Sequence, residues 1–207
     1  MPLPPADDVR VHTLDLTREP AGDALPSSDL RRAEREGPRW AAARAGLRRI
    51  LAGYLDEQPA SLRISDRDKP RLEPASPLRF NLSHSGDVAL LAVATEREVG
   101  IDVERIDRTR DIARLAGRMF LSAEQSAVHE ADDPVLSYHQ HWVAKEAFAK
   151  ATGKGLASMR SFEVSLNGPG GPRLVHVAND EAEARRWSLS LLDDLPPGYV
   201  GALAHEA

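Results

Sequence analysis

The chain contains no cysteine, little lysine and no long hydrophobic run. Without cysteine it cannot form disulfides, thiolate zinc sites or iron–sulfur clusters, and it has no cysteine nucleophile. Its longest apolar run is Val88–Ala94, far shorter than the ~18–20 residues of a membrane span. The first residues show neither a basic flank nor an apolar stretch, so we expect no secretory signal and a cytoplasmic protein.

Charge is also unevenly distributed. The 207 residues include 27 basic and 32 acidic side chains, which gives a net charge of −5. This balance disfavours a nucleic-acid-binding protein, because such proteins usually carry an excess of positive charge. The segment from Arg31 to Arg49, however, contains seven arginines and only two acids, so this part of the chain could receive an anion.

Hydrophobic periodicity predicts an α+β protein with two similar halves, residues 1–97 and 98–207. Period-3.6 patterns predict helices over residues 39–55, 111–119, 122–131 and 134–151. Alternation predicts strands within residues 9–16, 61–65, 80–94, 96–106, 161–166, 173–178, 186–192 and 199–207. The Pro- and charge-rich residues 18–38 predict a connection with about one helical turn. Each half thus has a strand, a helix and further strands in the same order, and a cleft between two halves is a common ligand site.

The segment GIDVE (Gly100–Glu104) places two carboxylates on a predicted strand. Residues two apart on a strand point to the same side, so Asp102 and Glu104 share one face. Ile101 and Val103 point the opposite way, into the core. Two parallel carboxylates repel each other unless a cation or a proton lies between them, and Mg²⁺ prefers such oxygen ligands. The alternative is ordinary alternation on a solvent-facing strand.

The segment WVAKEAFAK (Trp142–Lys150) lies on a predicted helix. Trp142, Glu146 and Lys150 follow one side of that helix, and Lys145 lies beside it. The simplest interpretation is an exposed Glu–Lys pair, which contributes only ~0.2–0.5 kcal/mol. A large aromatic side chain prefers burial, however, and charges next to it then need a partner, such as a bound polyanion or a metal ion.

The segment FNLSHSG (Phe80–Gly86) predicts a strand that leads into a turn at His84–Asp87. Hydroxyl groups, an imidazole and free backbone N–H groups there could form a phosphate-binding nest. The alternative is a turn in which the serines bond locally. The sequence contains no G-x-S-x-G, P-loop or G-x-G-x-x-G motif, so serine-hydrolase, P-loop and Rossmann interpretations lack support.

In this order and at this spacing, the three segments resemble the surfactin-type 4′-phosphopantetheinyl transferases. The similarity extends from about Arg39 to Ala204 and includes GKGL (Gly153–Leu156). The resemblance implies two similar α+β halves related by a pseudo-twofold axis, with the active site in the cleft between them. It implies Mg²⁺-dependent transfer of 4′-phosphopantetheine from coenzyme A to a serine of an acyl or peptidyl carrier protein, with release of 3′,5′-ADP, as in secondary metabolite biosynthesis.

The resemblance assigns metal-binding and catalytic roles in the second half of the chain. Asp102, Glu104 and Glu146 are similar to the Mg²⁺ ligands of the family. Lys145 and Lys150 are similar to the cationic residues beside the coenzyme A pyrophosphate. Glu146, directly or through a metal-held water, is the best-placed base for the carrier serine, so Glu146, Lys150 and Lys145 form the implied catalytic set.

Coenzyme A contacts are implied in the first half. Ser83 and His84 are similar to family contacts to the phosphates, and Arg39 is similar to the arginine that meets the 3′-phosphate of the adenosine. Lys69 is similar to the lysine of the family's G-K-P element. In this sequence Asp68 replaces the glycine of that element, which places an acid close to the expected polyanion.

The implied partners are coenzyme A and an apo carrier protein, with Mg²⁺ as the cofactor. Neither nucleic acid nor a membrane is implied, and a chain that carries both halves is expected to be a monomer. Two alternatives stay open. One is a homologue that binds coenzyme A without transferase activity, and the other is a different metal-assisted phosphohydrolase that uses the same carboxylates.

Overall fold

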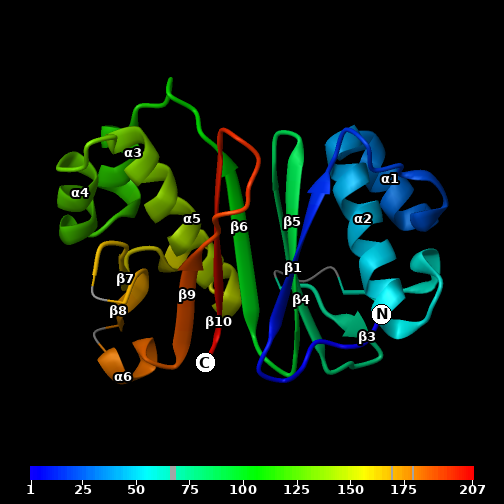
Figure 1. Cartoon of the computed structure of the whole chain (residues 1–207). Coiled ribbons are helices and arrows are strands. Elements are labelled where there is room, and N and C mark those ends of the chain that lie inside the picture. Colours follow the sequence, from blue (N-terminus) through cyan, green and yellow to red (C-terminus); the bar gives the residue numbers. More distant parts are fainter. Residues whose placement is uncertain (66–68, 169, 179) are drawn as a thin grey trace. The chain divides into compact units, whose positions relative to one another are not determined.

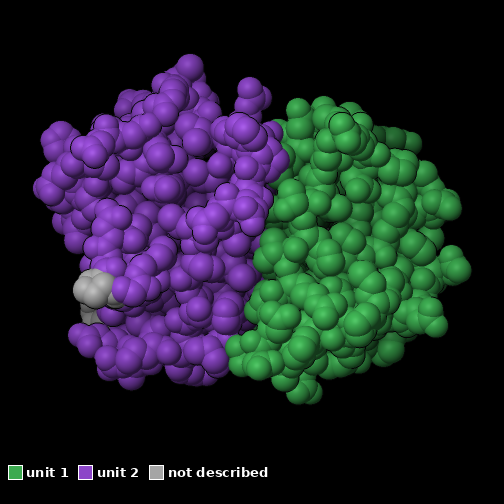
Figure 2. Space-filling model, in the orientation of Figure 1, with its two compact units in different colours: residues 1–97 green, residues 98–207 purple. Residues whose placement is uncertain are grey.

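The computed structural model describes residues 1–65, 69–168, 170–178 and 180–207. Within these ranges no helix has the length and hydropathy needed to cross a membrane. The chain divides into two compact units, residues 1–97 (green in Figure 2) and residues 98–207 (purple). Both units contain helices and strands, so the fold is mixed α and β.

Unit 1 is a three-stranded antiparallel sheet with a long helix packed against it (Figure 1). The spatial order of the strands is β1-β5-β4. The central strand β5 is apolar throughout Val88–Ala94, and each of these residues is at most 5% exposed. Leu47 and Leu51 of the helix pack with Leu91 and Val93 of β5. The elements of unit 1 are β1 (Val9–Asp15), η1 (Gly22–Ala24), α1 (Ser27–Glu36), α2 (Pro38–Leu55), η2 (Pro59–Ser61), β2 (Arg63–Ile64), β3 (Leu72–Glu73), β4 (Leu78–Ser85) and β5 (Val88–Thr95).

Unit 2 contains a second three-stranded antiparallel sheet, in the order β6-β10-β9, and a separate two-stranded sheet of β7 and β8. The long helix α5 supplies Val143, Ala147 and Phe148 to a core that includes Ala202 and Ala204 of β10. The elements of unit 2 are β6 (Val99–Arg105), α3 (Ile112–Met119), α4 (Ser122–His129), α5 (Pro134–Thr152), η3 (Leu156–Ser158), β7 (Phe162–Ser165), β8 (Arg173–Val177), α6 (Glu181–Ala184), β9 (Trp187–Leu191) and β10 (Tyr199–Glu206).

The main sheets of the two units share one topology. In unit 1 the chain forms β1, the long helix α2, then β4 and β5, and the last strand lies in the middle of the sheet. In unit 2 it forms β6, the long helix α5, then β9 and β10, and again the last strand is central. All four strand pairings are antiparallel. The main-sheet strands and the long helix therefore follow one order along the chain in both units.

Helix α1 lies where the sequence predicts a connection with about one helical turn, and that prediction is wrong. The helix is ten residues long and ends at Gly37, which has a φ of 91°. Its buried position is an acid: Asp29 is 7% exposed, and its carboxylate accepts hydrogen bonds from Arg44 and Arg48 of α2. Tertiary contacts with α2 therefore stabilise this helix, which the charged sequence of the segment does not predict by itself.

The turn predicted at His84–Asp87 is shorter in the structure. Strand β4 continues to Ser85, which pairs with Val88, so the turn consists of Gly86 and Asp87. Gly86 has a φ of 56°, a conformation that suits glycine in a two-residue hairpin turn. Ser83 and His84 thus lie on a strand and point to opposite faces, and they do not form the predicted phosphate-binding nest.

Candidate active site

Strand β6 and helix α5 lie in direct contact because Gly100 has no side chain. A Cβ at Gly100 would collide with the carbonyl oxygen of Ala147 and the backbone nitrogen of Ala151. Residues two apart on a strand point the same way, so Asp102 and Glu104 lie on the face of β6 that packs against α5. Both faces of the strand are buried, since Ile101 is 0% exposed and Asp102 is 4% exposed.

A lysine ammonium links the two acidic segments that the sequence analysis identified. Lys150 Nζ donates to Asp102 Oδ1 at 2.7 Å and lies 3.8 Å from Glu146 Oε2. Asp102 comes from β6, whereas Glu146 and Lys150 lie one helical turn apart on α5. The structure therefore brings Asp102, Glu146 and Lys150 together, although Asp102 is 48 residues from Lys150 in the sequence.

The electrostatics of this cluster point to an excess of negative charge. Burial raises the pKa of the Glu146 carboxyl, and the nearby Asp102 and Glu104 carboxylates raise it further, against the opposing effect of Lys150. The Asp102 and Glu104 carboxylates are thus close enough to disfavour the charge of Glu146. A cation placed among them would relieve this repulsion.

The donor set fits a hard divalent ion in its chemistry. Asp102, Glu104 and Glu146 offer only carboxylate oxygens, which Mg²⁺ prefers. Among the described residues, no group of three His, Cys, Asp or Glu side chains is spaced closely enough to hold a metal ion. In this conformation the ammonium of Lys150 supplies the positive charge next to Asp102 and Glu146. Binding of a metal ion would therefore require the three carboxylates to draw together and Lys150 to turn away.

Lys145 requires a correction. The family resemblance implies a position beside a coenzyme A pyrophosphate, but the Lys145 side chain is 0% exposed. Its Nζ donates to Glu124 Oε1 at 2.7 Å and to the carbonyl oxygen of Phe162 at 2.8 Å. It also lies 4.3 Å from the centre of the Phe162 ring. We therefore assign Lys145 a structural role and remove it from the candidate coenzyme A contacts.

Glu124 is a residue that the sequence analysis missed. Its carboxylate binds Lys145, accepts from the backbone nitrogen of Val164 at 2.9 Å and caps the start of α4 through the backbone nitrogen of Leu121 at 2.7 Å. An acid three residues after the N-cap residue, here Leu121, is a capping signal that the sequence does show. The burial of its carboxylate, and the partner on α5, depend on tertiary structure.

The candidate coenzyme A residues of unit 1 differ from one another in their contacts and in their exposure. Arg39, at the start of α2, donates to the carbonyl oxygen of Leu16 at 3.2 Å and lies 2.6 Å from Asp87 Oδ1, next to the β4–β5 turn. Ser83 is 8% exposed, whereas His84 is exposed. Asp87 is a partner of Arg39 that the sequence analysis did not identify.

The remaining candidate coenzyme A residue follows a part of the chain without a described structure. Lys69 is half-buried and directly follows residues 66–68. The replacement of the family glycine by Asp68 therefore lies outside the described residues, and the path of the altered G-K-P element stays a prediction.

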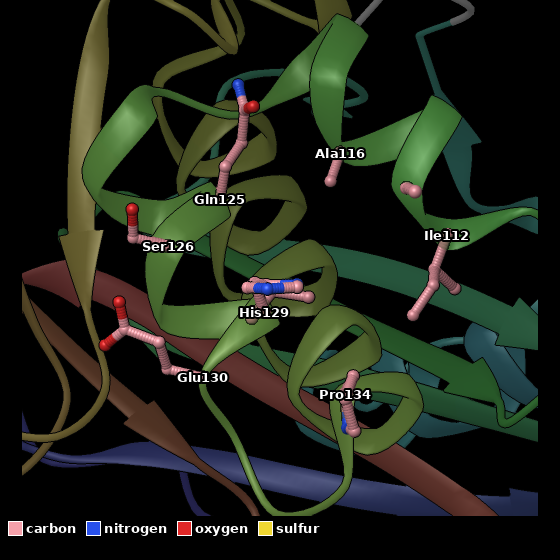
Figure 3. Close-up of a pocket in the computed structure, with 9 residues that line it drawn as sticks. Ile112, Ala116, Gln125, Ser126, His129, Glu130 and Pro134 are labelled. Carbon is pink, nitrogen blue, oxygen red and sulfur yellow. The ribbon is translucent and has the colours of Figure 1, made fainter.

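A separate cavity of about 370 Å³ lies between α3, α4 and the start of α5 (Figure 3). Ile112 and Ala116 of α3 and Pro134 of α5 supply apolar walls, and Gln125 and His129 of α4 supply polar groups. None of the site residues predicted from the sequence lines this cavity.

We expect Gly100→Ala to disturb the site by forcing β6 away from α5. The new Cβ meets helix backbone, which cannot move aside as a flexible side chain can, so we expect a loss of about 1–3 kcal/mol in the free energy of unfolding. Gly117→Ala on α3 is the matched control, because a Cβ there meets nothing within 4 Å. Chemical denaturation of both variants measures the difference. Equal stability of the two variants would contradict the close packing of β6 on α5.

The hydrogen bond by which the Asp133 carboxylate caps the N-terminus of α5 should persist in strong acid. Asp133 accepts from the backbone nitrogen of Leu136 at 3.0 Å and binds Arg108 at 2.7 Å. The hydrogen bond from Arg108, aided by that from Leu136, lowers the pKa of the Asp133 carboxyl from 3.8 to about 2. The pKa of Asp133 is lower in the folded protein than in the unfolded chain. The capping interaction therefore contributes fully to folding stability above pH 3.8, and this contribution is lost as the pH falls through about 2. Carboxyl NMR titration measures this pKa, which Arg108→Gln should raise; titration near 3.8 in the unaltered protein would contradict the prediction.

Comparisons with known proteins identify the family. The sequence model of the 4′-phosphopantetheinyl transferase superfamily matches residues 98–204. The chain is 38% identical over 154 residues to 4′-phosphopantetheinyl transferase HetI of Nostoc sp., which covers 69% of this chain and 65% of HetI. It is 35% identical over 150 residues to 4′-phosphopantetheinyl transferase AcpT of Escherichia coli, which covers 70% of each chain.

A solved structure of holo-[acyl-carrier-protein] synthase from Thermotoga maritima matches 53% of this chain and 62% of that chain, with 27% sequence identity and a TM-score of 0.43. The chain spans 65% of the length of HetI and 58% of a putative 4′-phosphopantetheinyl transferase of Synechocystis sp.. The matched residues 98–204 include β6 and α5, the two elements that carry the acidic cluster. The chain therefore belongs to the 4′-phosphopantetheinyl transferase superfamily.

Proposed function

We propose that the chain transfers 4′-phosphopantetheine from coenzyme A to a serine of an acyl or peptidyl carrier protein, and that it is of the surfactin type. The observation that carries the proposal is the convergence of Asp102 and Glu146 on one cation, the ammonium of Lys150. Family membership supports the reaction class. The acidic cluster supports the use of a divalent ion, because Asp102 and Glu104 disfavour the charge of Glu146 and a divalent cation would offset that repulsion.

The roles of the residues in unit 2 follow from their charges. Asp102, Glu104 and Glu146 would hold Mg²⁺, which when bound would neutralise charge on the pyrophosphate. Lys150, released from Asp102, would donate to an oxygen of the leaving 3′,5′-ADP. Phosphoryl transfer depends mainly on such positioning and charge neutralisation.

Glu146 is the candidate base for the carrier serine. As the bond from the serine oxygen to phosphorus forms, the bond from phosphorus to the oxygen of 3′,5′-ADP breaks, and the serine proton passes to Glu146 directly or through water.

Unit 1 would bind coenzyme A. We propose that Arg39 exchanges the carboxylate of Asp87 for the 3′-phosphate, and that Ser83, His84 and Lys69 contact further phosphate oxygens. The common topology of the two units supports the proposal that they are two versions of one α+β unit.

Intact-mass measurement on a panel of apo carrier proteins tests this function. With coenzyme A and Mg²⁺, at least one carrier should gain the mass of a phosphopantetheine group, and chelation of the divalent ion should prevent the gain. Binding of coenzyme A without a mass gain on any carrier would favour the homologue without transferase activity. Release of phosphate without a carrier would favour a phosphohydrolase.

A further inference from the structure

An arginine-lined cavity lies within unit 1, apart from the residues assigned to coenzyme A. It has a volume of about 540 Å³ and lies between α1, α2, η2 and the β2–β3 pair. Five of its lining residues are arginines and two are acids, Asp29 and Glu73, which leaves a formal charge of +3. Neither Arg39, Lys69, Ser83 nor His84 lines it. The lining arginines are Arg32, Arg35, Arg44, Arg48 and Arg63.

The inner wall of this cavity is fixed by a buried ion cluster. Asp29 Oδ2 accepts from the Nε atoms of Arg44 at 2.9 Å and Arg48 at 2.7 Å, so one carboxylate serves two guanidinium groups. Arg48 is 3% exposed and donates in addition to the carbonyl oxygens of Pro59 and Leu62. Burial tends to raise the pKa of Asp29, but the two guanidinium groups outweigh it and hold that pKa below its ordinary value. The cluster therefore keeps one positive charge in excess at any physiological pH.

Three of the lining arginines have N–H groups that are available to bind a ligand. Arg44 is held through its Nε atom, and among the described residues its terminal nitrogens have no hydrogen-bond acceptor. Arg35 makes one contact at the limit of hydrogen-bond length, 3.4 Å to the carbonyl oxygen of Arg31. The side chain of Arg63 on β2 is exposed and, within the described ranges, makes no hydrogen bond or ion pair. Arg32, by contrast, already contacts Glu36 and the Trp40 ring.

We infer that this cavity binds a small anion that carries a phosphate group. The guanidinium fork of arginine matches the oxygens of phosphate and donates two hydrogen bonds at once. The arginines come from three separate elements, α1, α2 and β2, around a partly open hollow, which suits a small ligand better than a flat macromolecular surface. The formal charge of +3 is large enough to neutralise the two negative charges that a phosphate group approaches near neutral pH.

Titration with inorganic phosphate, followed through the arginine Nε–H signals in NMR spectra, tests this inference. The protein is first saturated with coenzyme A, so that any site for coenzyme A is already filled, and sodium chloride at equal ionic strength serves as the reference. We expect phosphate to shift the signals of Arg44 and Arg48. The absence of such shifts, or equal shifts with chloride, would overturn the inference.

Variants separate this site from a general charge effect. Arg63→Gln and Arg35→Gln should each weaken phosphate binding by about tenfold, the value of one charged hydrogen bond. Arg31→Gln is the matched control, because Arg31 is exposed on the same helix and does not line the cavity. An equal loss in Arg31→Gln would contradict the site. Because phosphate binding requires no transfer reaction, this test stands or falls separately from the proposed function.

A different use of the same arginines would also be visible. If Arg35→Gln and Arg63→Gln raise the KM for a carrier protein and leave phosphate binding unchanged, the cavity wall belongs to a protein-docking surface and the inference is wrong. If they lower phosphate affinity and leave the KM for coenzyme A unchanged, the cavity is a separate anion site, as inferred.

Discussion

Glu146→Gln is expected to lower the rate of phosphopantetheine transfer by about 10²–10³-fold, the usual effect of removing one charge-stabilising group from an active site. Glutamine keeps the shape of the side chain but removes a carboxylate from the acidic cluster and the proposed base for the serine. Initial rates, measured as mass gain of an apo carrier, report the effect. Asp102→Asn should act in the same direction, because Asp102 holds the other side of the cluster.

Stability distinguishes this loss from misfolding. Burial and the two neighbouring carboxylates disfavour the charge of Glu146, so Glu146→Gln should leave the free energy of unfolding equal or higher in metal-free buffer. Added Mg²⁺ should stabilise the unaltered protein more than the variant. Glu130→Gln, at an exposed position after α4, is the control for loss of one acid. Transfer by Glu146→Gln at a rate close to that of this control would refute the proposed role.

Lys145→Met is expected to destabilise the fold strongly. The substitution leaves the Glu124 carboxylate buried without its cation, which typically costs 3–5 kcal/mol, or roughly 10 °C in Tm for a chain of this size. Glu124→Gln in the same chain should restore part of the loss, because it removes the unpaired charge. Thermal and chemical denaturation of the single and double variants measure the coupling.

Lys154→Met provides the control for this experiment, since Lys154 is exposed just beyond α5. If Lys145 instead contacted coenzyme A, Lys145→Met would raise the KM for coenzyme A and leave Tm unchanged. That result would return Lys145 to the coenzyme A site and refute its structural role.

The sequence predicted elements well where local periodicity determines them. The alternation in residues 80–94 and the helical spacing in residues 39–55 and 134–151 correspond to β4, β5, α2 and α5. Helix α1 was missed because its stability depends on Asp29 reaching two arginines of the next helix. The residue pattern of one segment carries no information about a contact with another helix.

The sequence predicted which residues belong to the candidate site better than it predicted the contacts between them. The rule that residues two apart on a strand share a face predicted the acidic pair Asp102 and Glu104. Helical spacing predicted that Glu146 and Lys150 lie on one side of a helix. The direct contact between Lys150 and Asp102 depends on the glycine at position 100, which lets α5 approach β6. The burial of Lys145 could not be read from its helix, because its partner Glu124 lies 21 positions away on another helix.

The position of β10 in the middle of its sheet has a consequence for how unit 2 folds. In unit 1, the central strand pairs with its sequence neighbour β4 across a two-residue turn. In the described part of unit 2, β6 pairs only with β10, where Val200 opposes Glu104 from 96 positions further along the chain. Closing so long a loop is slow. We therefore expect the strand that carries Asp102 to acquire its native order late, after the hairpin of unit 1 has formed, so that the acidic cluster is among the last features of the molecule to assemble.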